Sequence, residues 1–211
     1  MLSLVAMATA ILAPATEEDE RRFVLHGVPW SAYVALRDAL DDQSGLKMTY
    51  LKGALELMSP SRLHEDAKTI IGRLLEVWAM ERDVDLRGFG GATFRREAKE
   101  RGLEPDECYK LGKLDDDDVP DIAIEVIVSS GLVDKMAVYA GLDVPEVWEW
   151  RPSTRAIVVH RLMSVISGEY QYRTRSEVLP DLDLALLSSF VQPGENQTRL
   201  AKAYQAALRA R

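Results

Sequence analysis

The chain has a single cysteine, Cys108, among its 211 residues. A lone cysteine excludes an internal disulfide and every metal site built from several cysteines, and it suits a reducing compartment. No stretch of the sequence approaches the roughly 18 to 20 consecutive apolar residues that a membrane-spanning helix needs. We therefore expect a cytoplasmic protein that does not enter a membrane.

Positive charge is also scarce. The 26 Lys and Arg residues face 34 Asp and Glu residues, which leaves a formal net charge of −8. A chain of this sign does not hold nucleic acid by its overall charge. The acidic residues are concentrated in runs such as 115–118, which are usually solvated, whereas basic residues gather at 95–101 and 199–211. A local basic face is therefore compatible with the composition.

The domain organisation is simple. The apolar first 14 residues have no Lys or Arg before them to form the positive start of a signal peptide, so we expect residues 1–22 to be a loose segment. No repeat or low-complexity linker divides the remainder. We expect one domain over residues 23–193 and a C-terminal helix within residues 194–211.

Hydrophobic periodicity predicts a mixed α/β fold, in which a β-sheet is flanked by α-helices. The apolar residues after Ser59-Pro60 recur on one helical face, and the serine and proline are typical of a helix start. Lys52-Gly53 is a plausible tight turn within a hairpin. We expect further helices at 31–40, 132–142 and 198–211, and strands within 47–58, 92–97, 106–111, 122–128, 147–150 and 156–162.

Glu125 lies in the middle of the run IAIEVIV at 122–128, which predicts a strand buried on both faces. A carboxylate is costly to bury there unless a cation or a base compensates its charge. Strand alternation places Glu125 on the same face as Ala123 and Ile127. The chemical interpretation is a cation site, and the structural alternative is an internal salt bridge.

Asp106 follows Pro105 at the start of another expected strand. Two carboxylates that converge from neighbouring strands would form an oxygen site suited to Mg²⁺, an ion that polarises phosphodiesters. Lys135, in the first turn of the helix that follows Glu125, could bring an ammonium group to this site. Taken singly, a Pro-Asp pair is more typical of a turn, and a lone lysine is more typical of an exposed helix face.

Together, the PD motif at 105–106, the EVI motif at 125–127 and the lysine on the next helix resemble the PD-(D/E)XK nuclease superfamily, specifically its bacterial Uma-type family of proposed restriction endonucleases. The resemblance extends from about residue 28 to residue 191. Its most specific stretches are 53–61, 102–109 and 120–150. It implies a restriction-endonuclease-like fold and Mg²⁺-dependent hydrolysis of DNA, with Mn²⁺ as a substitute ion.

The resemblance also implies residue roles. Asp106, Glu125 and Glu56 would match the metal-binding acids, and all three would belong to the catalytic site together with a lysine. The sequence departs from the usual superfamily motif because Ile127 stands where that lysine is expected, two positions after Glu125. Lys135 is therefore the candidate for the catalytic lysine.

His64, near the start of the first long helix, matches a histidine that relatives also tend to carry. An auxiliary contact to the site or to a phosphate is one interpretation, and a capping or surface role is the other. We expect a homodimer, because paired active sites allow both strands of DNA to be cut. Two alternatives stay open: a non-catalytic binding or assembly module on the same fold, and a nuclease acting on RNA or on branched or single-stranded DNA.

Other residues have structural explanations. No histidine partner is indicated near Cys108, so we expect a small buried side chain there. Trp148 and Trp150 alternate along a strand and are expected to pack. Asp121 lies four strand positions before Glu125, about 13 Å away, and is expected to serve as a turn residue.

Overall fold

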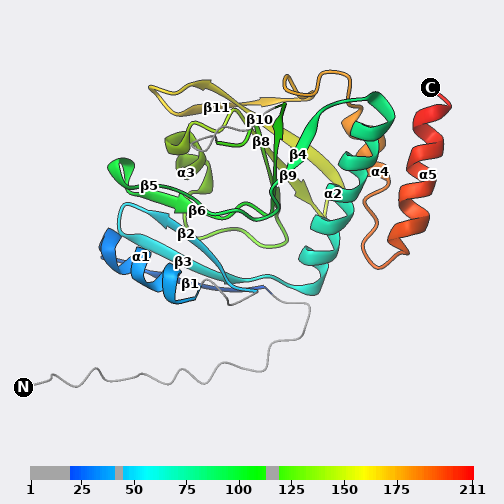
Figure 1. Cartoon of the computed structure of the whole chain (residues 1–211). Helices are drawn as coiled ribbons and strands as arrows, with labels where there is room; N and C mark the ends of the chain where they lie inside the picture. The colour runs from blue at the N-terminus through cyan, green and yellow to red at the C-terminus, as the bar shows by residue number, and fades with distance from the viewer. Residues whose placement is uncertain (1–19, 41–44, 113–118) are drawn as a thin grey trace, which may run out of the picture.

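The computed structural model describes residues 20–40, 45–112 and 119–211. The apolar start of the chain and the acidic run at 115–118 lie outside these residues. The described chain is a mixed α/β structure of two β-sheets and five α-helices (Figure 1). The expected fold class is confirmed, and the division of the strands into two sheets is new.

The first sheet is antiparallel, with the order β1-β3-β2-β6-β5. Lys52 and Gly53 both have positive φ angles, 45° and 87°, and form the predicted hairpin turn between two of its strands. Helix α1 (Trp30–Ala39) covers one face through a cluster that includes Tyr33 and Tyr50. The strands are β1 (Arg21–Leu25), β2 (Lys47–Leu51), β3 (Ala54–Ser59), β5 (Phe94–Arg96) and β6 (Arg101–Leu103).

The second sheet has the order β11-β10-β9-β8-β7-β4. Its strands are β4 (Leu86–Gly88), β7 (Glu107–Leu111), β8 (Ile122–Val126), β9 (Glu146–Arg151), β10 (Ala156–Ser164) and β11 (Glu169–Arg173). Strands β8 and β9 are parallel, and α3 (Lys135–Leu142) connects them. All five residues of β8 are buried, which confirms the prediction for this strand.

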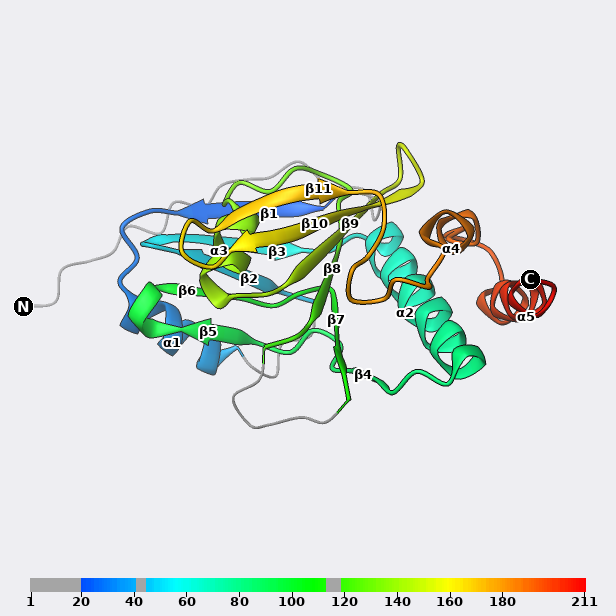
Figure 2. The same ribbon diagram turned by 90° about the horizontal axis from the view of Figure 1, so that it is seen from above.

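The helices occupy both faces of the second sheet. On one face, α2 (Arg62–Arg82) packs against the sheet, α4 (Leu184–Ser189) contacts both α2 and β10, and α5 (Gln197–Arg209) packs against α2 (Figure 2). Ile122, Ile124 and Val126 of β8 belong to this core. On the other face, Ala123 packs in a second core with residues of α3. Strand alternation therefore turns Glu125, which shares the face of Ala123, toward α3.

Two helix starts differ from the expectation. Helix α2 is capped by Ser61, whose hydroxyl accepts a hydrogen bond from the backbone N–H of His64 at 3.2 Å. The predicted start at Ser59 is wrong because Ser59 is still paired with Arg21 of β1. Helix α3 begins at Lys135, after its N-cap Asp134, rather than at residue 132.

Some elements near the two ends of the described chain also differ from the expected ones. Strand β1 begins at Arg21, inside the segment that was expected to be loose, and pairs with β3 along its whole length. Strand β11 and helix α4 were not predicted. The expected C-terminal helix is present as α5.

No helix in the described part of the chain is both long and apolar enough to cross a membrane.

Candidate active site

Asp106 is completely buried and immediately precedes β7, the strand that pairs with β8, which carries Glu125. Its backbone N–H donates to the carbonyl oxygen of Ile124 at 3.2 Å. Its carboxylate Oδ2 accepts a hydrogen bond from the backbone N–H of Val126 at 2.7 Å. These two contacts, with the residues on either side of Glu125, hold Asp106 next to Glu125 on the neighbouring strand.

Two cationic side chains contact Asp106. Lys47 Nζ of β2 lies 2.5 Å from Oδ1 and also donates to the carbonyl oxygen of Pro105 at 3.1 Å. The Nε2 atom of His64 lies 2.9 Å from Oδ2. Burial works to raise the pKa of Asp106, but Lys47 and His64 outweigh it and hold that pKa well below its usual range. Asp106 is therefore an anion.

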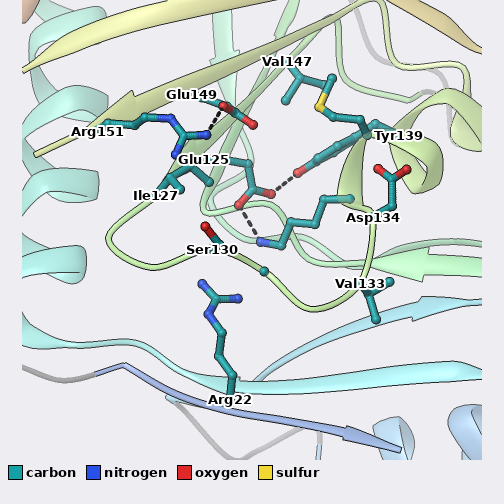
Figure 3. A pocket seen from close by; sticks show the side chains of 13 residues that line it. Arg22, Glu125, Ile127, Ser130, Val133, Asp134, Tyr139, Val147, Glu149 and Arg151 are labelled. Carbon is teal, nitrogen blue, oxygen red and sulfur yellow. Dashed lines mark hydrogen bonds and ion pairs between the residues drawn. The ribbon is translucent and has the colours of Figure 1, made fainter. Parts of the chain in front are cut away.

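Glu125 is 2% exposed and is held by two residues of α3 (Figure 3). Lys135 Nζ donates to Oε2 at 2.6 Å, and the hydroxyl of Tyr139 donates to Oε1. Burial raises the pKa of Glu125, and the negative charge of Asp106 adds to this effect, while Lys135 opposes it. Burial tends to lower the pKa of Lys135, but Glu125 and Asp106 outweigh it, so that pKa is raised.

Glu125 and Lys135 face a pocket of about 200 Å³ (Figure 3). Arg22 lies on one side of this pocket, and Arg151, which donates to Glu149 Oε2 at 2.8 Å, lies on another. The loop between β8 and α3 contributes Ser130, Gly131, Val133 and Asp134 to the lining. A ligand in this pocket can reach the carboxylate and the ammonium group together.

The expected three-acid metal site is not assembled. Within residues 20–40, 45–112 and 119–211, no group of three or more His, Cys, Asp or Glu side chains is arranged to hold a metal ion. Asp106 and Glu125 remain as a pair. Mg²⁺ commonly takes one or two protein carboxylates and completes its coordination with water and phosphate oxygens, so two carboxylates are the type of ligand that the ion prefers. In this structure their oxygens contact Lys47, His64, Lys135 and Tyr139 instead.

Glu56 uses both carboxylate oxygens for protein contacts. Oε1 lies 2.6 Å from Nη1 of Arg22. Oε2 accepts hydrogen bonds from the backbone N–H groups of Leu132 and Val133, the latter at 3.1 Å. The structure thus places Glu56 against the loop that precedes α3, and its assignment as a metal-binding acid stays a prediction.

His64 bridges Asp106 and Glu20, because its Nδ1 atom lies 2.7 Å from Glu20 Oε1. Burial works to lower the pKa of His64, but hydrogen bonds with Asp106 and Glu20 raise it to about 9, so the imidazole is charged at neutral pH. Burial likewise works to raise the pKa of Glu20, and hydrogen bonds with His64, Ser129 and Arg22 lower it to about 2. His64 therefore contacts Asp106, and its auxiliary role stays a prediction.

Sequence reasoning missed Lys47, Tyr139, Glu20 and Arg22. Tyr139 could have been found, because it lies four residues after Lys135 and residues at this spacing share one helix face. No local signal marks the other three, since each is an ordinary charged residue in or beside a strand. Their roles depend on contacts between distant parts of the chain.

The remaining residues behave as expected. Cys108 is completely buried, and burial raises the pKa of its thiol to about 12, so it is no nucleophile at neutral pH. Trp148 and Trp150 are buried in the core. Asp121 accepts a hydrogen bond from the backbone N–H of Leu111 at 2.9 Å, a local structural role.

Comparison with known proteins places the chain in a family. No curated protein matches it. A crystal structure described as that of a "putative nuclease belonging to DUF820", from Anabaena variabilis, is similar over 75% of this chain and 90% of that chain, with 13% sequence identity and a TM-score of 0.42. The model of the Uma2 family, described as "Putative restriction endonuclease", matches residues 30–194. The chain therefore belongs to the Uma2 family of putative restriction endonucleases.

Proposed function

We propose that this protein is a Mg²⁺-dependent endonuclease that hydrolyses phosphodiester bonds of DNA. The observation that carries the proposal is the buried Glu125 carboxylate, which meets Lys135 Nζ at 2.6 Å and faces a pocket, with Asp106 held beside it. Membership of the Uma2 family supports a nuclease function. The ion and the substrate are our proposal.

Asp106 and Glu125 would hold the metal ion, with Mn²⁺ able to replace Mg²⁺. When bound, such an ion polarises a phosphodiester and lowers the pKa of an attacking water. The two carboxylates are acceptors in a site from which most water is excluded, since both are buried. Burial strengthens their attraction for a divalent cation.

Lys135 would act on the substrate directly. Its pKa is raised by the two acids, so the ammonium group keeps its charge at neutral pH. A fixed ammonium at the pocket can orient a water molecule or stabilise the negative charge that grows on the phosphate as the bond breaks. Tyr139 keeps Glu125 in place by donating to its other oxygen.

The proposed enzyme would be a homodimer in the cytoplasm, with one active site for each strand of DNA. Its net charge of −8 opposes DNA overall, so binding must come from local basic groups and from the metal ion. Light scattering coupled to size-exclusion chromatography measures the oligomeric state. A monomer that cuts both strands would reject the proposed dimer and leave the proposed metal-dependent hydrolysis unchanged.

The experiment measures cleavage of supercoiled plasmid, single-stranded DNA and RNA with Mg²⁺ or Mn²⁺ and with EDTA. We compare wild type with Glu125→Gln and Lys135→Met, which remove one charge each at nearly constant size. The matched controls are Glu169→Gln and Lys202→Met, at exposed positions. We expect metal-dependent DNA cleavage that each site variant lowers by about 10² to 10³-fold and that the controls retain.

Other outcomes assign the protein differently. If only RNA or only single-stranded DNA is cleaved, the proposed substrate is wrong, and the proposed site around Glu125 and Lys135 stands. Absence of cleavage, together with no heat of metal binding in calorimetry, would reject the proposal in favour of a non-catalytic binding or assembly module. Cleavage that survives both site variants would place the active site elsewhere.

A further inference from the structure

We infer that Arg22 and Glu56 are positioning residues, which together clamp the loop 129–133 and so hold Lys135 against Glu125. The inference rests on the proposed function of the Glu125–Lys135 pair. It gives Glu56 a role other than metal binding, and it makes the β1 strand part of the site.

The loop needs such a clamp because of its place in the chain. Glu125 is in β8 and Lys135 is the first residue of α3, and the loop that joins the two elements lies between them. Ten positions separate the two residues whose side chains meet at 2.6 Å. The distance between the carboxylate and the ammonium therefore depends on the path of the loop.

The contacts of the clamp reach both ends of the loop. Arg22 donates from Nε to the Ser129 hydroxyl at 3.0 Å and from Nη2 to the Ser129 carbonyl at 3.4 Å. Glu56 accepts the backbone N–H groups of Leu132 and Val133. Arg22 and Glu56 are joined to each other at 2.6 Å, so the ion pair connects the two ends of the loop. Glu20 belongs to the same network, because it accepts from the Ser129 N–H at 3.1 Å and from Arg22 Nη2 at 3.0 Å.

The sheet holds the ion pair rigidly. Strand β1 pairs with β3 so that Arg22 is opposite Met58 and Glu56 is opposite Val24. Arg22 and Glu56 are thus diagonal neighbours on one face, where long side chains can reach each other. Their side chains are 8% and 1% exposed. A buried pair with all its hydrogen-bonding atoms engaged has little freedom to move.

The clamp also lies against the pocket itself. Arg22, Gly131 and Lys135 line the same pocket as Glu125 (Figure 3). A Cβ added at Gly131 would lie 3.7 Å from Glu56 Oε2 and 3.8 Å from Arg22 Nη1, so the loop passes directly over the ion pair. A shift of the clamp is therefore transmitted to the position of Lys135.

The test combines Glu56→Gln and Arg22→Lys with Lys135→Met in double-mutant cycles. Glu56→Gln removes the charge that binds Arg22, and Arg22→Lys cannot reach Ser129 and Glu56 together. We expect each clamp variant to lower kcat about tenfold or more, with KM and the Kd for Mn²⁺ within about twofold of wild type. In the Lys135→Met background the same variants should have almost no further effect.

A purely structural role gives a different result. Glu146→Gln changes a buried acid whose hydrogen-bond partners, Trp148, Ser176 and the backbone of residues 177–178, lie outside the loop, and it serves as the matched control. Its effect on kcat should be the same with and without Lys135. If Glu56→Gln and Arg22→Lys also act equally in both backgrounds, the positioning role is overturned. A loss of Mn²⁺ affinity above about tenfold in Glu56→Gln would make Glu56 a metal ligand instead.

A second measurement tests the clamp without relying on nuclease activity. Amide hydrogen exchange of Leu132 and Val133 should be slow in wild type and at least tenfold faster in Glu56→Gln. Unprotected amides in wild type would overturn the clamp. If wild type cleaves no nucleic acid, the proposed function fails, and the exchange rates still decide whether Glu56 holds the loop.

Discussion

Lys47 Nζ lies 2.5 Å from Oδ1 of Asp106, and this contact joins the two sheets at the candidate site. Lys47 belongs to β2 of the first sheet, and Asp106 precedes β7 of the second. Each of the two buried acids therefore has its own lysine, Lys47 for Asp106 and Lys135 for Glu125. A divalent cation held by the two acids, as we propose, would meet two ammonium groups as well as two carboxylates.

The variant Lys47→Met should bind divalent cations more tightly. Removal of one positive charge beside Asp106 lowers the repulsion that an entering cation meets, and we expect a gain in affinity of about tenfold. Without metal the variant should melt at a lower temperature, because Asp106 loses a partner in a buried site. Titration calorimetry with Mn²⁺ measures the affinity, with the exposed Lys202→Met as control. Weaker binding in Lys47→Met would show that this lysine does not compete with the metal.

The variant Tyr139→Phe isolates the second contact of Glu125. The phenol hydroxyl donates to Glu125 Oε1, and the buried ring packs in the core around α3. Loss of the hydroxyl keeps the ring and frees one carboxylate oxygen, so we expect cleavage to fall about tenfold, less than for Lys135→Met. Tyr172→Phe, at a side chain that is 60% exposed, is the matched control. Unchanged cleavage would assign the tyrosine to packing alone.

The variant Glu20→Gln should change how stability depends on pH. The pKa of Glu20 in the folded protein is lowered to about 2 from its ordinary value of 4.5, so its stabilising contribution is fully present above pH 4.5 and is lost as the pH falls through 2. At pH 7 the variant should be less stable than wild type by about 1 to 3 kcal/mol. The difference should shrink steadily below pH 4.5. Urea unfolding from pH 7 to pH 3 measures it, with Glu169→Gln as control, and a difference that grows in acid would contradict the assignment.

Glu146 is a buried acid of another kind, and its removal should affect stability alone. Its oxygens accept from the Trp148 indole at 2.9 Å, the Ser176 hydroxyl at 2.7 Å, and the backbone N–H groups of Glu177 and Val178 at 2.7 and 3.1 Å. Glu146→Ala leaves these donors unsatisfied, and we expect a loss of at least about 3 kcal/mol in the free energy of unfolding. Calorimetry measures the loss. Cleavage well below the melting temperature should equal that of wild type, and a large fall would connect Glu146 to the chemistry.

The fold was predictable where local patterns decide it. The apolar residues of α2 recur at helical spacing, and β8 is an unbroken apolar run apart from Glu125, so both elements follow from the sequence. The start of α3 did not follow. Nothing in the local sequence prevents Leu132 and Val133 from being the first residues of the helix. In the structure their N–H groups donate to Glu56, which is 76 and 77 positions away in the sequence.

The residues of the candidate site also fall into those that local sequence patterns predict and those that they do not. Glu125 stood out because a carboxylate in an apolar strand is a local anomaly, and Asp106 stood out only as a second carboxylate on a neighbouring strand. Lys47 and Arg22 did not, because a charged residue in a strand usually faces solvent. The contact between Arg22 and Ser129 spans 107 residues and is created only when β1 adds to the first sheet.

Cys108 gives the folded chain a single thiol with no access to solvent and a pKa of about 12. Thiol reagents act on the thiolate at an exposed sulfur, so the native protein should be almost inert to them at neutral pH. A cysteine introduced on the loop beside the pocket, for example at Ser130, would then be the one place where a fluorescent or spin label attaches. Reaction at Cys108 itself would report that β7, the strand next to the buried acids, has opened.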